Sequence, residues 1–150
     1  MATGIEDIKE LREETGMSVT DVKKALDEAG GDSVKAKDLL RSRGVEIAKK
    51  KQEREAGEGI IEAYLHPTRK TGVLLDLRCE TDFVAKADDF KALAHELVLQ
   101  IAAMSPESVD ELLAQEYIKD SSKTVRSLLE EVVAKLGENI VIARFERYQI

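Results

Sequence analysis

Apolar residues recur at two different spacings along this chain, and the change of spacing divides it into two parts. Over residues 1–44 they recur every three or four positions, in three short runs that end at Gly16, at Gly30 and Gly31, and at Gly44. This spacing puts apolar side chains on one face of a helix, and glycine is common just after a helix end. The first part is therefore predicted to be three short helices around one small core.

The second part begins with two runs of strand-like spacing, residues 59–65 and residues 73–79, in which alternate side chains lie on opposite faces; Val73, Leu75, Leu77 and Cys79 make one face of the second run apolar. The residues between them include Pro67 and Gly72, so the chain turns there. Two alternating runs joined by a short turn predict an antiparallel hairpin. Helical spacing then returns in a long helix with one apolar face, formed by Ala87, Phe90, Ala94, Leu97, Ile101 and Met104.

Two more helices and one strand are expected after the long helix. Ser105 and Pro106 are expected to begin a short helix that reaches about Tyr117, and the next helix is expected to end at Gly137. A final strand over residues 139–148 follows. Strict alternation would place its apolar residues on both faces, with Val141, Ala143 and Phe145 on one and Ile140 and Ile142 on the other.

The expected fold class is α+β, with an N-terminal three-helix bundle followed by a three-stranded antiparallel sheet packed with helices. Residues 1–44 would form the helical module and residues 58–150 a single α+β core. Residues 45–57 are polar after Ile47 and end near two glycines, so we interpret them as a linker that is itself helical.

Composition excludes several classes of function. Lys and Arg number 23 against 30 Asp and Glu, a net charge of −7, which argues against nucleic-acid binding through phosphates. No apolar run approaches the length of a membrane span, and the first residues lack the apolar core of a signal peptide. The single cysteine, Cys79, fits a reducing cytoplasm. We expect a cytoplasmic protein that binds neither nucleic acid nor membranes.

The sequence also has few residues of the types that carry out catalysis or bind a cofactor. The chain has two histidines and one cysteine, and it has no glycine-rich phosphate loop. We therefore expect no metal, no cofactor and no direct binding of a nucleotide.

The segment Thr81, Asp82, Phe83 and Val84 lies where the second strand passes into the long helix. Thr81 or Asp82 can cap a helical turn, and Phe83 can project outward as an apolar side chain. Alternatively, Phe83 lies four residues before Ala87 and extends the apolar face of the long helix into the core. Periodicity alone favours the core alternative.

Residues 81–85, Thr-Asp-Phe-Val-Ala, resemble the signature of the elongation factor Ts family, the nucleotide exchange factors of elongation factor Tu. The similarity continues toward both ends of the chain. That family's N-terminal module, a ubiquitin-associated-like bundle, is similar to this chain at residues 9–12, 15–16, 21–26 and 28–32. Its closing strand is similar at residues 137–142 and 144–145.

The resemblance implies a guanine nucleotide exchange factor that acts by protein binding and is not an enzyme. Residues 81–84 would enter elongation factor Tu·GDP and promote GDP release by disturbing the Mg²⁺ and phosphate site, with Phe83 as the wedge and Asp82 as its polar neighbour. Arg12 and the loop at Val19 and Thr20 would touch the GTP-binding domain of the partner. The family often has two methionines where this chain has Val19 and Thr20, so this contact is smaller and more polar here.

The chain also departs from the family in length. Many relatives have a second core subdomain and a helical hairpin, whereas residues 104–123 alone bridge the interval between the long helix and the last helix here. Short members of the family resemble symmetric dimers. We therefore expect a homodimer through the core sheet, at the strand that carries Ile140 and Ile142.

Two other classes of function remain open beside nucleotide exchange. A generic adaptor would use the N-terminal bundle to bind an unrelated helical protein and would not change nucleotide release. A small enzyme would need a cluster of titratable groups, and the sequence shows no such constellation.

Overall fold

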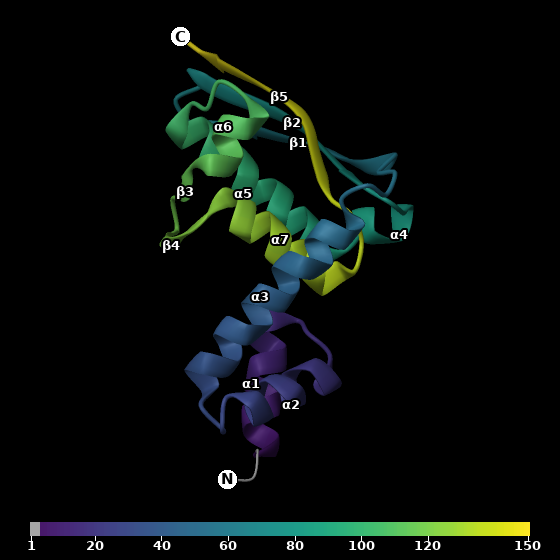
Figure 1. Cartoon of the computed structure of the whole chain (residues 1–150). Helices are drawn as coiled ribbons and strands as arrows, with labels where there is room; N and C mark the ends of the chain where they lie inside the picture. Colours follow the sequence, from purple (N-terminus) through teal and green to yellow (C-terminus); the bar gives the residue numbers. More distant parts are fainter. Residues whose placement is uncertain (1–3) are drawn as a thin grey trace.

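The computed structural model describes residues 4–150, which form a mixed helical and sheet structure, and the predicted α+β class is confirmed. The helices of this part of the chain are α1 Ile5–Thr15, α2 Val19–Glu28, α3 Ser33–Lys51, α4 Asp82–Ala85, α5 Asp88–Met104, α6 Val109–Ala114 and α7 Val125–Leu136. The strands are β1 Glu58–Leu65, β2 Thr71–Cys79, β3 Glu116–Tyr117, β4 Asp120–Thr124 and β5 Val141–Gln149. Figure 1 shows α1 and α2 at one end of the molecule and the sheet at the other, with α3 running between them.

The N-terminal bundle forms because side chains cap the starts of α2 and α3 and because the apolar faces of the three helices meet. The Ser18 hydroxyl accepts a hydrogen bond from the Asp21 amide, and the Asp32 carboxylate accepts two from the first turn of α3. Gly16 ends α1 in the left-handed conformation, at φ +69°. The three predicted helices are confirmed, and their core consists of Leu11, Met17, Val22, Ala25, Leu26, Ala36 and Leu40.

The third helix does not end at Gly44, and that prediction is wrong. Gly44 lies inside α3, and a Cβ there would meet Ala134 of α7 at 3.4 Å, so the glycine allows the two helices to approach closely. Packing against α7 carries the helix through a residue that would weaken it in isolation. With 19 residues, α3 is a rod of about 28 Å.

The main sheet has the order β1-β2-β5 and is antiparallel throughout. One face of β2, with Val73, Leu75, Leu77 and Cys79, is buried against the core that includes α5. In the described part of the chain, helices lie on this side of the sheet only (Figure 1). We call the opposite side the open face; its side chains include Ile61, Leu65, Leu74, Asp76, Arg78, Val141, Arg144 and Tyr148.

Strict alternation along the last strand is wrong, because β5 contains a bulge. Leu77 pairs with Ile142 and Asp76 pairs with Arg144, so Ala143 is an extra residue without a partner on β2. The bulge brings Ile142 and Phe145 to the same, core-facing side. Ile140 and Ile142 are buried in this chain's own core, and they do not form an outer surface for a second chain.

The region between α5 and α7 also differs from the prediction. Helix α6 begins after Ser108, whose hydroxyl caps it, and residues 116–124 form the small antiparallel pair β3-β4. The buried Gln100 side chain holds this pair, since it donates to the Glu116 carbonyl at 3.0 Å and accepts from the Ile118 amide at 2.9 Å. Met104, at the end of the predicted apolar face of α5, is exposed.

Gly59 of β1 provides a test of the sheet geometry. Its φ is +150°, and a Cβ would collide with the carbonyl oxygen of Leu77. We expect Gly59→Ala to lower the free energy of unfolding by more than about 1 kcal/mol. The matched variant is Gly57→Ala, whose added methyl meets nothing within 4 Å; its effect should stay below about 0.5 kcal/mol. Equal urea midpoints for the two variants would contradict this account.

Candidate partner-binding site

Phe83 lies on α4, a single helical turn between the end of β2 and the start of α5. Its side chain is 85% exposed, so the core alternative is wrong. The Thr81 hydroxyl caps the turn by accepting a hydrogen bond from the Val84 amide at 3.3 Å, which confirms one of the two predicted caps. We call residues 81–85 the Phe83 turn. It presents one large aromatic side chain to solvent.

The other side chains of the Phe83 turn divide between solvent and core. Thr81 and Asp82 are exposed, whereas Val84 and Ala85 are buried in the main core. The Asp82 carboxylate pairs with the Lys86 ammonium at 2.8 Å, and this hydrogen bond raises the pKa of Lys86. Of the four residues singled out in the sequence, Thr81, Asp82 and Phe83 can therefore reach a partner, and Val84 anchors the turn.

Glu138, which the sequence analysis did not single out, binds the base of the Phe83 turn. One carboxylate oxygen accepts from the amides of Glu80 and Thr81 at 3.1 and 3.0 Å, and the other accepts from the Thr81 hydroxyl at 2.7 Å. In the reverse direction, the Glu80 carboxylate accepts from the Asn139 amide at 2.7 Å. We call these four residues the Glu138 clasp. The only sequence signal for it was the family-like stretch that follows Gly137.

Asn139 extends the clasp to the chain that leaves α3. Its side-chain amide is buried and donates to the carbonyl oxygens of Arg54 at 2.7 Å and Gln52 at 3.4 Å. The Arg54 guanidinium lies 3.7 Å from the Glu80 carboxylate. The chain that leaves α3 and the base of the Phe83 turn are thus attached to the neighbouring residues Asn139 and Glu138, just before the last strand.

The predicted N-terminal contact residues lie together at one end of the bundle. Arg12 is in the last turns of α1, and Val19 and Thr20 open α2 after the short connection through Gly16. All three are exposed, with Val19 at 47%. This end of the bundle offers a small surface with one cation and two short side chains.

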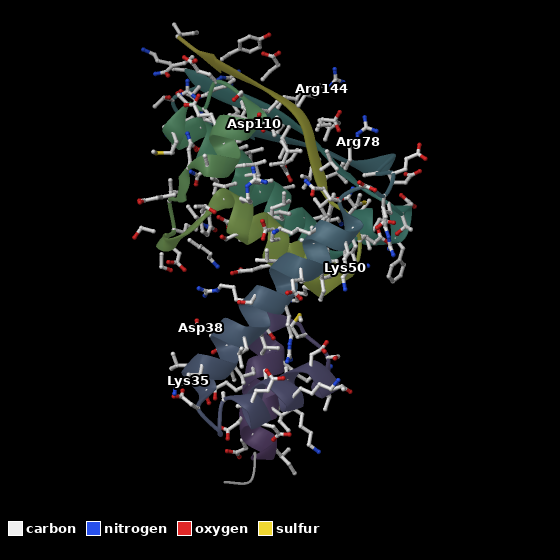
Figure 2. The ribbon with its side chains drawn as sticks, viewed as in Figure 1. Lys35, Asp38, Lys50, Arg78, Asp110 and Arg144 are labelled. Atoms are coloured by element: carbon white, nitrogen blue, oxygen red, sulfur yellow. The ribbon has the colours of Figure 1, made fainter. Side chains whose placement is uncertain are left out.

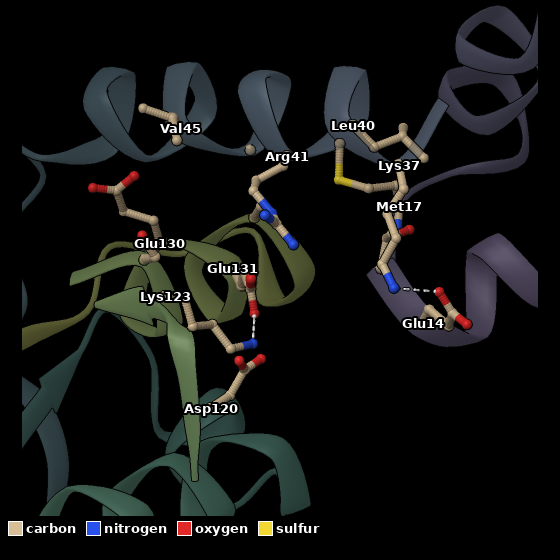
Figure 3. Close-up of a pocket in the computed structure, with 14 residues that line it drawn as sticks. Glu14, Met17, Lys37, Leu40, Arg41, Val45, Asp120, Lys123, Glu130 and Glu131 are labelled. Atoms are coloured by element: carbon tan, nitrogen blue, oxygen red, sulfur yellow. Dashed lines mark hydrogen bonds and ion pairs between the residues drawn. The ribbon is translucent and has the colours of Figure 1, made fainter. Parts of the chain in front are cut away.

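A crevice between the bundle and the core is a weaker candidate. Its volume is about 240 Å³, and Figure 3 shows Arg41 of α3 pointing into it. Charges of both signs line it, and several are already paired: Lys37 with Glu14 at 2.8 Å and Lys123 with Glu131 at 3.0 Å. With four acidic and three basic side chains in its lining, the crevice shows no strong preference for an anion or a cation.

The open face of the sheet combines apolar side chains with one ionic cluster. Asp76 is buried between Arg78 and Arg144, whose guanidinium groups project from the sheet (Figure 2). The hydrogen bond from Arg78 is the main cause that holds the pKa of Asp76 below its ordinary value. Beside this cluster, Ile61 and Leu74 are 59% and 52% exposed. Such a surface is suited to protein contact.

Residues 4–150 offer few groups suited to enzyme chemistry. Cys79 is buried, and burial raises the pKa of its thiol to about 11, so it is not a ready nucleophile. Among the described residues, no group of three or more His, Cys, Asp or Glu could hold a metal ion. No helix in this part of the chain is both long and apolar enough to cross a membrane.

Comparison with known proteins gives one consistent family. A family model described as Elongation factor TS matches residues 80–150. The chain is 42% identical to Elongation factor Ts of Leptospira biflexa over 195 aligned positions, which cover all of this chain and 98% of the relative. It is 40% identical to the protein of the same name from Coprothermobacter proteolyticus, with 95% of each chain covered. It is also 40% identical to that of Rubrobacter xylanophilus, with both chains fully covered.

The alignment also measures how short this chain is. The 195 positions aligned with the Leptospira protein exceed the 150 residues of this chain by 45, so at least that many positions lack a residue here. The predicted shortening relative to the family is confirmed.

The exposure of Phe83 leads to a stability prediction. Phe83→Ala should change the free energy of unfolding by less than about 0.5 kcal/mol, because the side chain is in water. The matched variant is Phe90→Ala on α5, where the side chain is 0% exposed; it should lose about 3–5 kcal/mol. Urea denaturation followed by circular dichroism measures both. A large loss for Phe83→Ala would mean that the side chain is part of the core.

Proposed function

Because the chain belongs to the elongation factor Ts family, we propose that it binds elongation factor Tu·GDP and promotes GDP release. The observation that carries this proposal is the exposed Phe83 on a turn that Val84 and Ala85 anchor in the core. A large aromatic side chain is held in water at a fixed place, where it is available to a partner. The chain acts by binding and carries out no covalent chemistry.

Phe83 is the wedge in this proposal. It enters the partner beside the nucleotide and displaces the groups that hold Mg²⁺ and the phosphates. Because Mg²⁺ neutralises phosphate charge, disturbing its coordination weakens the hold on GDP. Asp82 stands next to Phe83 as an exposed carboxylate paired with Lys86, so the wedge has a charged neighbour that can bind polar groups at the edge of the opened site.

Magnitudes show that Phe83 cannot act alone. Accelerating release by about 10⁴-fold requires preferential stabilisation of the nucleotide-free partner by roughly 5.5 kcal/mol. Full burial of one phenylalanine side chain contributes roughly 1.5–3 kcal/mol. Exchange factor and nucleotide weaken one another's binding reciprocally. A second contact must therefore supply binding energy that keeps Phe83 in place against the returning nucleotide.

The N-terminal module, residues 1–44, is the proposed second contact. Arg12, Val19 and Thr20 would touch the GTP-binding domain of elongation factor Tu. The linker of residues 45–57, which begins as the last turns of α3, joins the module to the core of residues 58–150, and Figure 1 shows the module and α4 near opposite ends of α3. A rod of about 28 Å separates the two contacts enough for both to engage one partner at different places.

The open face of the sheet is the proposed homodimer surface. Ile61 and Leu74 are exposed there around the Asp76 cluster, and they border a shallow hollow of about 210 Å³. A second copy of the same chain would cover an equivalent face by two-fold symmetry. It would place its own sheet against the side of the sheet that this chain leaves bare. This surface replaces the one at Ile140 and Ile142, which is buried.

The exchange experiment compares matched variants in release of labelled GDP from elongation factor Tu. The unmodified chain should accelerate release, and Phe83→Ala should remove about ten-fold or more of that acceleration, since lost burial of roughly 1.5–3 kcal/mol corresponds to at least one decade. Ile118→Ala, an exposed apolar residue between β3 and β4, is the matched control and should keep full activity. Binding to the partner without acceleration would identify an adaptor instead.

The dimer experiment is analytical ultracentrifugation. We expect the unmodified chain to sediment as a dimer at micromolar concentration, and Leu74→Glu to sediment as a monomer, because it places a charge in the apolar part of the open face. A monomer for the unmodified chain at micromolar concentration and above would contradict the proposed surface and leave the exchange activity untouched.

A further inference from the structure

We infer that Glu138 is a positioning residue for exchange: its carboxylate fixes the Phe83 turn in the orientation that a partner meets. This inference rests on the proposed function. Glu138 lies 55 residues after Phe83 in the sequence and touches the turn only at its base. It acts through Thr81, and it leaves Phe83 itself uncovered.

The Phe83 turn needs such support because it is too short to hold itself. Helix α4 has four residues, and an isolated helical turn is unstable because its nucleation is unfavourable. Its buried side, at Val84 and Ala85, fixes the turn from one direction only. The Glu138 carboxylate holds the other end, where the amides of Glu80 and Thr81 would otherwise lack a partner in a strand or helix.

The chemistry of the clasp specifically suits a carboxylate. Three donors converge on Glu138: two backbone amides on one oxygen and the Thr81 hydroxyl on the other. An ionised carboxylate presents acceptors on both oxygens, and hydrogen bonds to a charged acceptor are stronger than neutral ones. The Thr81 hydroxyl in turn accepts from the Val84 amide. The chain of bonds therefore runs from Glu138 through Thr81 into the turn.

Glu138 is itself held firmly by its neighbours. Gly137 ends α7 in the left-handed conformation at φ +77°, and Asn139 and Ile140 are buried. Asn139 also binds the carbonyl oxygens of Gln52 and Arg54. The clasp therefore connects the Phe83 turn to two fixed elements, the end of α7 and the chain that follows α3. Because α3 also belongs to the N-terminal bundle, the clasp links the position of Phe83 to the position of the N-terminal contact residues.

A fixed turn matters for exchange because an ordered side chain binds without first losing its freedom. A Phe83 turn that moves should still allow the N-terminal module to bind the partner. It should disturb the nucleotide site less often, because misplacement by about 1 Å can cost up to roughly 100-fold. Loss of the clasp should therefore lower the maximal exchange rate and leave the half-saturating concentration of the chain nearly unchanged.

The test uses the full chain with Glu138→Ala, Glu138→Gln and the control Glu107→Ala, an exposed glutamate in the segment between α5 and α6. Release of labelled GDP from elongation factor Tu is measured against chain concentration. We expect Glu138→Ala to lower the maximal rate by roughly 10- to 100-fold. Glu138→Gln, which retains one acceptor oxygen for the two amides, should fall between Glu138→Ala and the unmodified chain. Glu107→Ala should match the unmodified chain.

A second readout does not depend on exchange. The chain has no tryptophan, so Phe83→Trp supplies a single tryptophan on the turn, whose fluorescence can be excited selectively. Adding Glu138→Ala to Phe83→Trp should lower the fluorescence anisotropy, while circular dichroism shows the same secondary structure. If Glu138→Ala does not fold, the same comparison with Glu138→Gln decides whether Glu138 orders the Phe83 turn.

The outcomes separate the two proposals. Unchanged anisotropy together with a maximal rate within two-fold of the unmodified chain would overturn the role of Glu138. If the unmodified chain itself fails to accelerate GDP release, the proposed function is wrong, and the anisotropy alone then decides whether the clasp positions the turn.

Discussion

Burial of Val84 and Ala85 in the main core forces the opposite side of the same helical turn into solvent. Successive residues of a helix point about 100° apart, so a turn that buries two neighbours cannot also bury Phe83, which precedes them. The exposed aromatic side chain is thus a consequence of how the turn is anchored. The core holds the turn in place, and the Glu138 clasp fixes the direction in which Phe83 points.

The rest of the fold joins the N-terminal bundle to the Phe83 turn. Helix α3 passes from the N-terminal bundle to the core without a break and packs closely on α7 at Gly44. Asn139 binds carbonyl oxygens of the chain that leaves α3, and the preceding residue, Glu138, holds the Phe83 turn. Both proposed contacts with elongation factor Tu are therefore built on one continuous framework.

Most of the fold follows from local patterns in the sequence. The helical spacing, the glycine stops and the alternation in β1 and β2 were sufficient, because each reflects a side chain that faces the core. Patterns failed where a contact distant in sequence decides the structure. Gly44 stays helical where α3 packs against α7, the bulge at Ala143 exchanges the faces of β5, and β3 is too short to have a period.

The candidate site was located from the sequence by resemblance, since the period of α5 favoured a buried Phe83. Phe83 is exposed because the helix breaks between α4 and α5, and the spacing of apolar residues alone does not reveal that break. The clasp was missed for a related reason: Glu80 and Glu138 are ordinary charged residues, and only the fold brings them together.

The most direct test of the account is the rate of labelled GDP release from elongation factor Tu·GDP, measured as the concentration of the unmodified chain is increased. We expect an acceleration that saturates, because a bound complex must form before GDP leaves. A chain that binds elongation factor Tu and leaves the release rate unchanged at saturation would contradict it.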